Sequence, residues 1–329
     1  MANHGKYDDD TSQFVTVPTY DVHIQLRTNF IMKINSHALS HSISEKLKVL
    51  LFITPLLIPL LTFWIVPFGW SIYISFTDWD YISPKYSYVG LENYQYMFED
   101  SYFMDALNNT FVFALGVVIP TIMLGLVFAL LLHKNFRGSQ LYRAVIFSPW
   151  ITPTVAVSIV WSWVFETKSG LANLLLGKLG FEPIPWLESG DTAMIVVIIV
   201  TVWQAVGWTM LFFISALNKI PESLYEASLI DGCSPWTRFI KITLPLISPT
   251  TFFLIIVNMI TAIQAFDQFQ ILTQGGPSGS TRTLLYLFYQ QAFEQYDMGP
   301  AAATSLIILL ITGVLTLVNT EMGKRWIYY

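Results

Sequence analysis

Histidine clusters are common sites of acid–base and metal chemistry, and this chain concentrates its histidines near the amino terminus. His37 and His41 are four residues apart, a spacing that can place two metal ligands on one helix face. The sequence offers no third ligand nearby, and His133 is the one histidine after residue 41. The G-x-x-x-x-G-K-[ST] phosphate loop and the H-E-x-x-H zinc motif are both absent. We therefore expect no enzyme, metal site or cofactor here, so that Mg-ATP would bind to another subunit.

Aromatic and uncharged polar side chains occur together in two apolar segments, where they could bind a neutral solute rich in hydroxyl groups. Aromatic faces stack on sugar rings, while amides and hydroxyls form hydrogen bonds with the solute between them. The candidates are Trp203, Gln204, Trp208, Asn258, Thr261 and Gln264. The alternative is that the tryptophans pack helices together or belong to an interfacial belt.

Helix geometry separates the two tryptophans of this candidate path. Trp203 and Trp208 are five residues apart, so on a helix they point about 140° from each other. Both cannot face the centre of one narrow pore, although both can flank a wide cavity. We expect Trp203 and Asn258 to contact the solute and Trp208 to lie at the cavity edge.

A charged island, Glu226–Pro249, separates the two apolar segments. Acidic and apolar residues alternate at helical spacing up to Asp231, which predicts a short amphipathic helix. Gly232 is a plausible left-handed terminator, and Ser234-Pro235 is typical of a helix start. The sequence therefore predicts two short helices joined by a tight turn. The second carries Trp236 and Phe239, which suits docking into a partner; the alternative is a loop lying on the lipid surface.

The whole chain has the composition of a membrane protein. Of its 329 residues 54% are hydrophobic and 12% charged, against about 25% charged in soluble proteins. The net charge of −5, without a basic cluster, gives no indication of nucleic acid binding. The single cysteine, Cys233, excludes an intrachain disulfide, and we interpret it as a small residue only.

Six apolar segments without Asp, Glu, Lys or Arg are each long enough to cross a bilayer of roughly 30 Å. They are Val49–Phe76, Leu107–Leu132, Ala144–Phe165, Ala193–Leu217, Leu246–Phe266 and Pro300–Thr320. The polar residues 1–45 before them are expected to form a disordered cytoplasmic tail. Placing both termini in the cytoplasm leaves thirteen of the 17 Lys and Arg residues inside, as the positive-inside rule requires.

The charged island resembles the EAA loop of permease subunits of binding-protein-dependent ABC importers. The matching residues are Glu226, Ala227, Ser228, Asp231, Gly232, Phe239, Ile242, Leu244 and Pro245. In that family the loop, here residues 219–245, is a coupling helix seated in a groove of the ATP-hydrolysing subunit. The resemblance implies coupling roles for Glu226, Ala227, Asp231, Gly232, Trp236, Phe239, Leu244 and Pro245. It also implies an all-α, six-helix type I importer fold (MetI-like) over residues 46–329.

Two outer segments resemble the carbohydrate branch of that family. Val89–Thr110 is similar to the segment after the first span, and we expect a short amphipathic helix there. Leu272–Tyr286 is similar to a Gly-Gly-Pro outer loop, in which Gly275, Gly276 and Pro277 should make a turn. A gapless register from Thr201 to Gly276 against maltose-type subunits places their sugar-contacting positions at Thr201, Trp203, Gln204, Ala205, Trp208, Asn258, Thr261 and Ala262. The last three depart from the maltose-type residues, which argues against maltose itself.

The resemblance implies a permease subunit that forms half of a path for a sugar or oligosaccharide. Its partners would be a second permease, two ATP-binding subunits and an extracytoplasmic solute-binding protein, in the plasma membrane of a prokaryote. Glycerol 3-phosphate or a related phosphodiester is the alternative solute, since such permeases share the Gly-Gly-Pro loop. A membrane scaffold without transport is a more remote alternative, because a scaffold has no reason to present a coupling loop.

Overall fold

Helices account for nearly all the regular structure of the chain. The computed structural model describes residues 45–134 and 136–326, so the expectations for the amino-terminal tail, His37 and His41 included, lie outside the described residues. Within the described residues there is no β-strand, only an isolated antiparallel bridge between Thr77 and Tyr88. The chain divides into two compact units, and the boundary along the sequence lies between Gly69 and Trp70.

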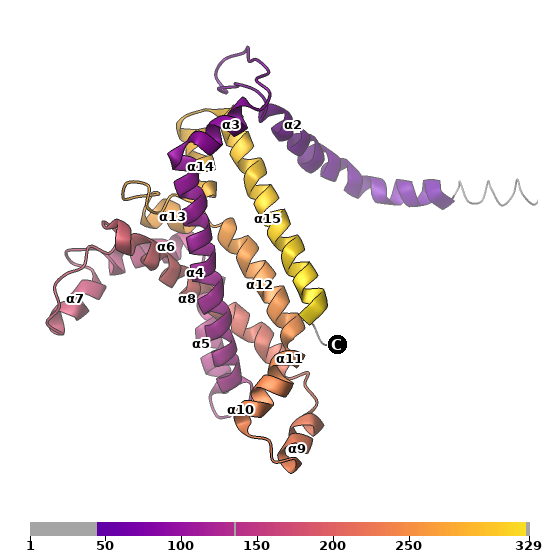
Figure 1. Cartoon of the computed structure of the whole chain (residues 1–329), viewed down its shortest axis with the longest axis vertical. Helices are drawn as coiled ribbons and strands as arrows, with labels where there is room; N and C mark the ends of the chain where they lie inside the picture. The colour runs from indigo at the N-terminus through magenta and orange to yellow at the C-terminus, as the bar shows by residue number, and fades with distance from the viewer. Residues whose placement is uncertain (1–44, 135, 327–329) are drawn as a thin grey trace, which may run out of the picture. The chain divides into compact units, whose positions relative to one another are not determined.

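The first apolar segment is helical over Glu45–Ile74, and its last part contains the π-helical stretch η1 (Leu61–Ile65) and α2 (Val66–Ile74). The remaining elements belong to the second unit. They are α3 (Glu92–Glu99), α4 (Ser101–Leu132), α5 (Ser139–Ile151), α6 (Thr154–Val164), α7 (Leu171–Lys178), α8 (Gly190–Leu217), α9 (Glu222–Ile230), α10 (Pro235–Arg238), η2 (Phe239–Thr243), α11 (Leu244–Leu246), α12 (Ser248–Ile263), α13 (Asp267–Leu272), α14 (Leu284–Tyr289), η3 (Gln290–Glu294) and α15 (Met298–Trp326) (Figure 1).

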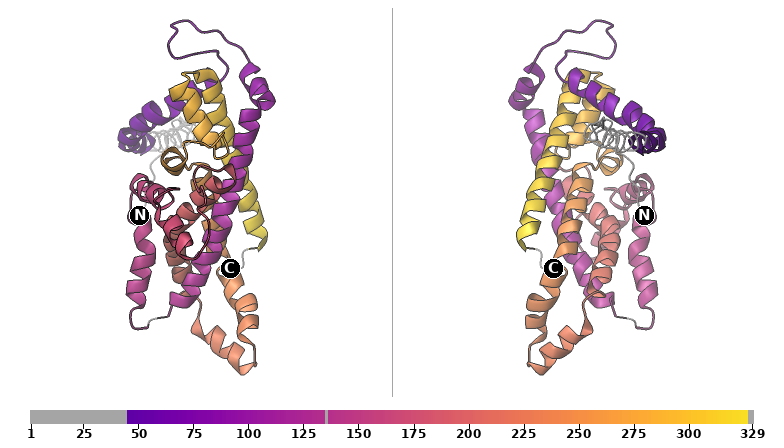
Figure 2. Two further views of the ribbon diagram at one scale, coloured as in Figure 1. Left: turned by 90° about the vertical axis from the view of Figure 1, so that its left-hand side faces the viewer. Right: turned by 90° about the vertical axis from the view of Figure 1, so that its right-hand side faces the viewer.

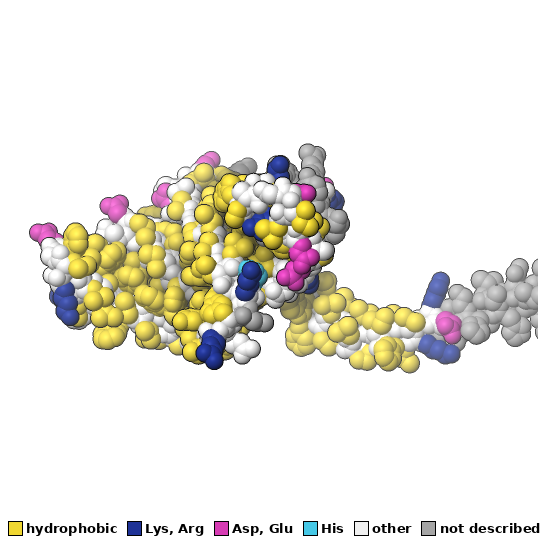
Figure 3. Space-filling view, turned by 90° about the horizontal axis from the view of Figure 1, so that it is seen from below, with side chains coloured by type: hydrophobic (Ala, Val, Ile, Leu, Met, Phe, Trp, Pro, Cys, Tyr) yellow, Lys and Arg dark blue, Asp and Glu magenta, His cyan; other side chains and the backbone are white. Residues whose placement is uncertain are grey.

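Four of the six predicted spans are single long helices, and each of the other two is a bent pair. Glu45–Ile74, Ser101–Leu132, Gly190–Leu217 and Met298–Lys324 are long and apolar enough to cross a membrane unaided. Most of the fifth predicted span, Leu246–Phe266, is the helix Ser248–Ile263, and a bend of 64° at its start separates it from Pro235–Leu246. The described residues therefore contain four candidate spans, or six if each bent pair is counted as one span. In the view from below, hydrophobic side chains cover most of the visible surface (Figure 3).

The third predicted span, Ala144–Phe165, is not one continuous helix. It divides into α5 and α6, whose axes differ by 99°. Pro153 removes a backbone donor and forces Thr152 out of the helical region, to φ −79° and ψ 133°. The side-chain Nε2 of Gln204 on α8 donates to the Thr152 carbonyl at 3.1 Å. The break is therefore stabilised by a neighbouring helix, as membrane proteins require for freed backbone groups.

Helix α8 is the centre of the second unit. It packs against α4 and α5, while α12 lies between α4 and α15 (Figures 1 and 2). A Cβ added at Gly207 would lie 2.1 Å from the Ile146 carbonyl oxygen and 2.6 Å from the Phe147 Cα. Glycine at this position thus lets the backbones of α8 and α5 approach closely, as small residues do between membrane helices.

The predicted amphipathic helix Val89–Thr110 is two elements. The chain is helical as α3, leaves the helical region at Asp100, and starts again as α4 with the Asp100 carboxylate accepting from the Tyr102 backbone N–H. On α3, Met97 is buried and Phe98 is exposed. The segment is therefore helical as expected, but most of its second half belongs to a long span.

The Gly-Gly-Pro segment forms the predicted turn and is fixed to α4. The Gly276 backbone N–H donates to the Thr273 carbonyl at 2.9 Å, and Gly275 has φ +76°. The Asn109 amide donates to the carbonyls of Gly279 and Arg282, both at 3.0 Å. This loop therefore lies beside α4 at Asn109, eight residues after that helix begins at Ser101.

Candidate functional site

The candidate solute path is arranged around α8, which carries two of its tryptophans on different faces. Trp203 meets Trp161 of α6 edge-on, with ring centroids 5.3 Å apart. Trp208 stacks on Trp150 of α5, also at 5.3 Å. Each tryptophan therefore contacts a different arm of the broken third span. Trp203 keeps 41% of its surface exposed, whereas Trp208 is only partly exposed.

An aromatic series continues from Trp203 to the connection between α6 and α8. Trp161 stacks on Phe165 at 5.4 Å, and Phe165 meets Trp186 edge-on at 5.5 Å. The Trp186 indole N–H donates to the Asn173 side-chain oxygen at 2.9 Å. The Asn173 side-chain N–H groups in turn donate to the backbone carbonyls of Thr167 and Ile184. Part of the Trp203 ring is thus in helix packing, while 41% of its surface is exposed.

Two predicted path residues use their side chains inside the protein. Gln204 is buried, and its amide donates to the Thr152 carbonyl and to the Thr154 hydroxyl. Asn258 is also buried, and its amide donates to the Leu254 carbonyl at 2.8 Å and to the Thr209 hydroxyl at 3.4 Å. In this conformation both residues stabilise helix contacts.

The other two predicted path residues are exposed. Thr261 lies on α12, and its hydroxyl donates to the Val257 carbonyl of its own helix at 2.9 Å. Gln264 follows the last turn of α12, and its side chain is exposed. The structure therefore does not bring the six predicted path residues together: the two tryptophans lie on different faces of α8, Gln204 and Asn258 are buried, and Thr261 and Gln264 are exposed.

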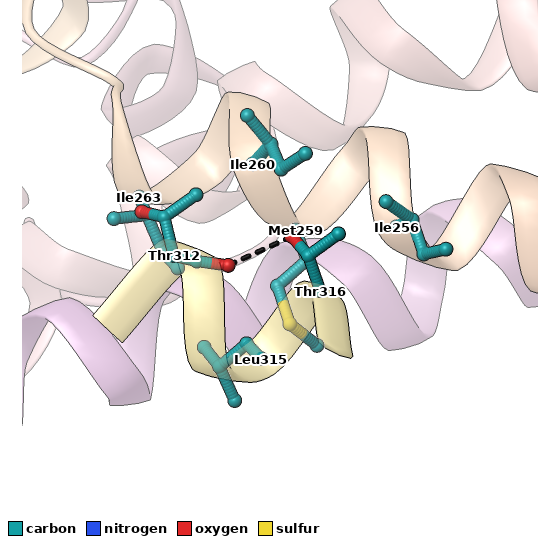
Figure 4. Close-up of a pocket in the computed structure, with 7 residues that line it drawn as sticks. All are labelled: Ile256, Met259, Ile260, Ile263, Thr312, Leu315 and Thr316. Carbon is teal, nitrogen blue, oxygen red and sulfur yellow. Dashed lines mark hydrogen bonds between the residues drawn. The ribbon is translucent and has the colours of Figure 1, made fainter. Parts of the chain in front are cut away.

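A small hollow between α12 and α15 is unsuited to a polar solute. Its lining residues are Ile256, Met259, Ile260, Ile263, Thr312, Leu315 and Thr316 (Figure 4). The two threonine hydroxyls donate to carbonyls of their own helix. The hollow thus has a mostly apolar lining, and its two hydroxyl groups already use their protons within α15.

The charged island folds as the predicted helix–turn–helix. Helix α9 ends at Ile230 with Asp231 as its C-cap, and Gly232 has φ +70°, the left-handed conformation expected of it. The Cys233 N–H donates to the Ser228 carbonyl at 2.9 Å and the Gly232 N–H to the Leu229 carbonyl at 3.1 Å. This pair of bonds is the Schellman arrangement, which satisfies the last carbonyls of a helix.

The second half of the island also starts as predicted. The Ser234 side chain accepts from the Thr237 backbone N–H at 3.2 Å, and Pro235 takes the first helical position. The helix continues through α10, η2 and α11 without a break at Pro245. The Tyr225 and Thr243 hydroxyls lie 3.0 Å apart and join the two halves.

The island presents an apolar and aromatic surface. Ile230 is 88% exposed and Trp236 is 68% exposed, and the Trp236 ring stacks on Phe239 at 5.7 Å. The remaining coupling candidates are exposed or partly exposed: Glu226, Ala227, Asp231, Gly232, Leu244 and Pro245. An exposed apolar surface of this kind is typical of a site that contacts another protein or a membrane.

Comparison with known proteins decides the family. Residues 121–327 match the model of the "Binding-protein-dependent transport system inner membrane component" family. The chain belongs to this family. It is therefore a multi-pass inner-membrane permease of a binding-protein-dependent importer, and the family is one of transport proteins and not of enzymes. The non-transporting scaffold is thereby set aside.

The permease has close relatives among curated proteins. It is 35% identical over 282 residues to the sn-glycerol-3-phosphate transport system permease protein UgpA of Escherichia coli (strain UTI89), covering 85% of this chain and 95% of the relative. It is 34% identical to the UgpA protein of Pectobacterium atrosepticum, covering 84% and 94%.

Solved structures confirm the fold of this permease. A chain of a bacterial ABC transporter that imports the acidic polysaccharide alginate matches with a TM-score of 0.76 at 18% identity, covering 88% of this chain and 99% of that one. The same kind of transporter in complex with an alginate pentasaccharide-bound periplasmic protein matches with a TM-score of 0.75 at 19% identity, covering 86% and 96%. The predicted all-α permease fold is therefore confirmed.

Sequence reasoning missed one polar residue of this permease. Asp267 begins α13, one residue after the predicted end of the fifth span at Phe266. A rule that ends each span at its first charge places such a residue in a loop. The signal that could have revealed it is the apolar, aromatic sequence that continues on both sides of it.

Proposed function

We propose that this permease forms half of the translocation path for a neutral carbohydrate. The observation that carries the proposal is Trp203, an aromatic residue of the central helix α8 that keeps 41% of its surface exposed and could stack on a sugar ring. Thr261 and Gln264 add exposed, uncharged hydrogen-bonding groups. None of the predicted spans contains Lys or Arg, the residues that bind anionic solutes best.

The exposed island is proposed to dock into an ATP-binding subunit. Trp236, Phe239 and Ile230 supply an apolar contact surface, and the Gly232 turn fixes the angle between the two helices that carry them. Glu226, Ala227, Asp231, Leu244 and Pro245 complete the coupling surface. Two such subunits hold Mg-ATP, and their closure moves the island, so that the spans alternate between inward-facing and outward-facing states.

The remaining partners follow from the same mechanism. A second permease subunit completes the path, and an extracytoplasmic solute-binding protein delivers the carbohydrate. Both termini of this chain lie in the cytoplasm of a prokaryotic cell, which places the island on the side where ATP is available. The excess of basic residues in those segments supports this orientation.

Glycerol 3-phosphate is the second candidate solute, because the curated relatives are named for its transport. A phosphate group favours a cation in the path, and a bidentate arginine above all. Arg282 is the nearest basic residue in the sequence after the fifth span, but its guanidinium lies over the Tyr102 ring, 5.1 Å from the centroid. The second permease would have to supply the cation.

Competition experiments can distinguish the two solutes. The importer is assembled with its own binding protein and ATP-binding subunits in liposomes, and ATP-driven uptake is measured with labelled oligosaccharides. We expect unlabelled oligosaccharide to compete and sn-glycerol 3-phosphate to have no effect. Uptake of sn-glycerol 3-phosphate, with no response to any oligosaccharide, would instead establish the second candidate.

A further inference from the structure

Asp267 lies at the depth of the membrane spans. Two residues after it on α13, Phe269 packs edge-on against Phe113 of α4, with ring centroids 4.7 Å apart. Phe113 is twelve residues after the start of α4 at Ser101, about 18 Å along the helix, and about 28 Å from its end at Leu132. It also lies six residues inside the apolar stretch that begins at Leu107. Helix α13 is therefore inside the membrane-spanning layer, where it packs against α6 (Figure 1).

The side chain of Asp267 points away from the protein core. Residues two apart on a helix differ in direction by about 200°. Phe269 and Leu272 are buried, whereas Asp267 is exposed. Asp267 forms no ion pair with any other residue that the structure describes.

A charged carboxylate at this depth requires water or a polar partner. An Asp facing hydrocarbon costs about 2.5–3.5 kcal/mol at a span centre even on insertion scales, and intramembrane carboxylates therefore face a bundle interior or an aqueous cavity. Gln264 and Thr261, both exposed and uncharged, precede Asp267 along the chain. Helix α13 also packs against α8, which carries the exposed Trp203.

We propose that Asp267 lines the solute path and determines its charge preference. Its oxygens accept hydrogen bonds from the hydroxyl groups of a neutral solute and repel phosphate or carboxylate groups. The proposal rests on the function proposed above, because it assigns a selectivity residue to that path.

The test measures the local potential without using any substrate. Cys233 is replaced by Ser, and Gln264→Cys supplies a thiol three residues from Asp267. In the assembled importer at low ionic strength, the thiol is modified with cationic trimethylammonium-ethyl methanethiosulfonate and, separately, with its anionic sulfonatoethyl counterpart. We expect Asp267→Asn to lower the cation-to-anion rate ratio about sixfold, as Coulomb's law gives for unit charges about 8 Å apart in water.

Control variants separate the charge from the structure. Asp267→Glu retains the charge and should retain the ratio, and Asp105→Asn removes an exposed carboxylate of α4 and should also leave it unchanged. Co-purification of the partner subunits shows that each variant assembles. In uptake assays, Asp267→Asn should make sn-glycerol 3-phosphate a better competitor.

Three outcomes would overturn the proposal. The first is a thiol at position 264 that reacts with neither reagent in any nucleotide state, and the second is a ratio unaffected by Asp267→Asn. The third is a rise in the ratio for Asp267→Asn, which would show the carboxylate paired with a cation of the second permease. If the ratio falls as expected but the importer takes up no carbohydrate, the charge filter stands and the proposed solute fails.

Discussion

The contact between Gly207 and α5 gives the sharpest prediction for this fold. In Gly207→Ala the new Cβ would lie 2.1 Å from the Ile146 carbonyl oxygen and 2.6 Å from the Phe147 Cα. Both are backbone atoms, so no side-chain rotation can relieve the clash. The two helices must separate by more than about 1 Å to reach ordinary contact distances near 3.4 Å, a shift that close-packed interiors resist.

That separation acts on contacts on either side of Gly207. One is the bond of 3.1 Å from Gln204 to the Thr152 carbonyl, and the other is the stack of Trp208 on Trp150. Overpacking costs about 1–3 kcal/mol and a lost buried hydrogen bond about 1 kcal/mol more. At about 2–4 °C for each kcal/mol, the apparent melting temperature should fall by about 5–15 °C.

The assay is thermal stability of the purified importer, followed as the intact complex that remains by size-exclusion chromatography after heating. Gly313→Ala is the matched control, because Gly313 lies on α15 with no atom within 4 Å of an added Cβ. Alanine should leave that variant unchanged or stabilise its helix by up to about 1 kcal/mol. A Gly207→Ala importer as stable as the Gly313→Ala control would refute the close approach of α8 and α5.

Four further variants test the site and the orientation of the chain. Trp203→Ala should reduce carbohydrate uptake while assembly and basal ATP hydrolysis persist; a complex that fails to assemble would show that the ring only packs helices. Gly232→Val should strain the left-handed turn by about 1–2 kcal/mol or more and abolish ATP-driven uptake, and unchanged uptake would contradict the coupling role. Gln204→Leu should destabilise the importer by about 1–3 kcal/mol, measured by the same heating assay, because the Thr152 carbonyl loses its donor. A cysteine at Ser278 should react with an impermeant reagent from outside the cell and Cys233 should not, whereas the opposite pattern would invert the topology.

The parts of the fold that depend on local sequence were predictable. The turn at Gly232 is specified within about ten residues, because the glycine, the Ser234 cap and Pro235 each act on their own backbone. The spans were predictable for a similar reason, since an apolar stretch of twenty residues has few stable alternatives to a helix in a membrane. The structure confirms the turn, and it confirms four of the six spans as single long helices.

The break in the third span could not be read from its own sequence. Pro153 alone permits either a kinked continuous helix or a sharp turn, because membrane helices tolerate proline when a neighbour satisfies the freed carbonyl. The neighbour here is Gln204, fifty-two residues after Thr152. A residue expected to bind solute therefore stabilises the 99° bend between α5 and α6.

The bend also determines which side chains the two tryptophans on α8 contact. If the third span were one straight helix, Trp203 and Trp208, which point about 140° apart on α8, could not both contact it. Since α5 and α6 diverge, Trp208 stacks on one arm through Trp150 and Trp203 meets the other through Trp161. The Trp208 ring centroid also lies 4.5 Å from that of Phe212, so two aromatic side chains pack against Trp208. Trp203 has Trp161 as an aromatic partner and keeps 41% of its surface exposed, so of the two tryptophans it is the one with more surface left for stacking on a solute.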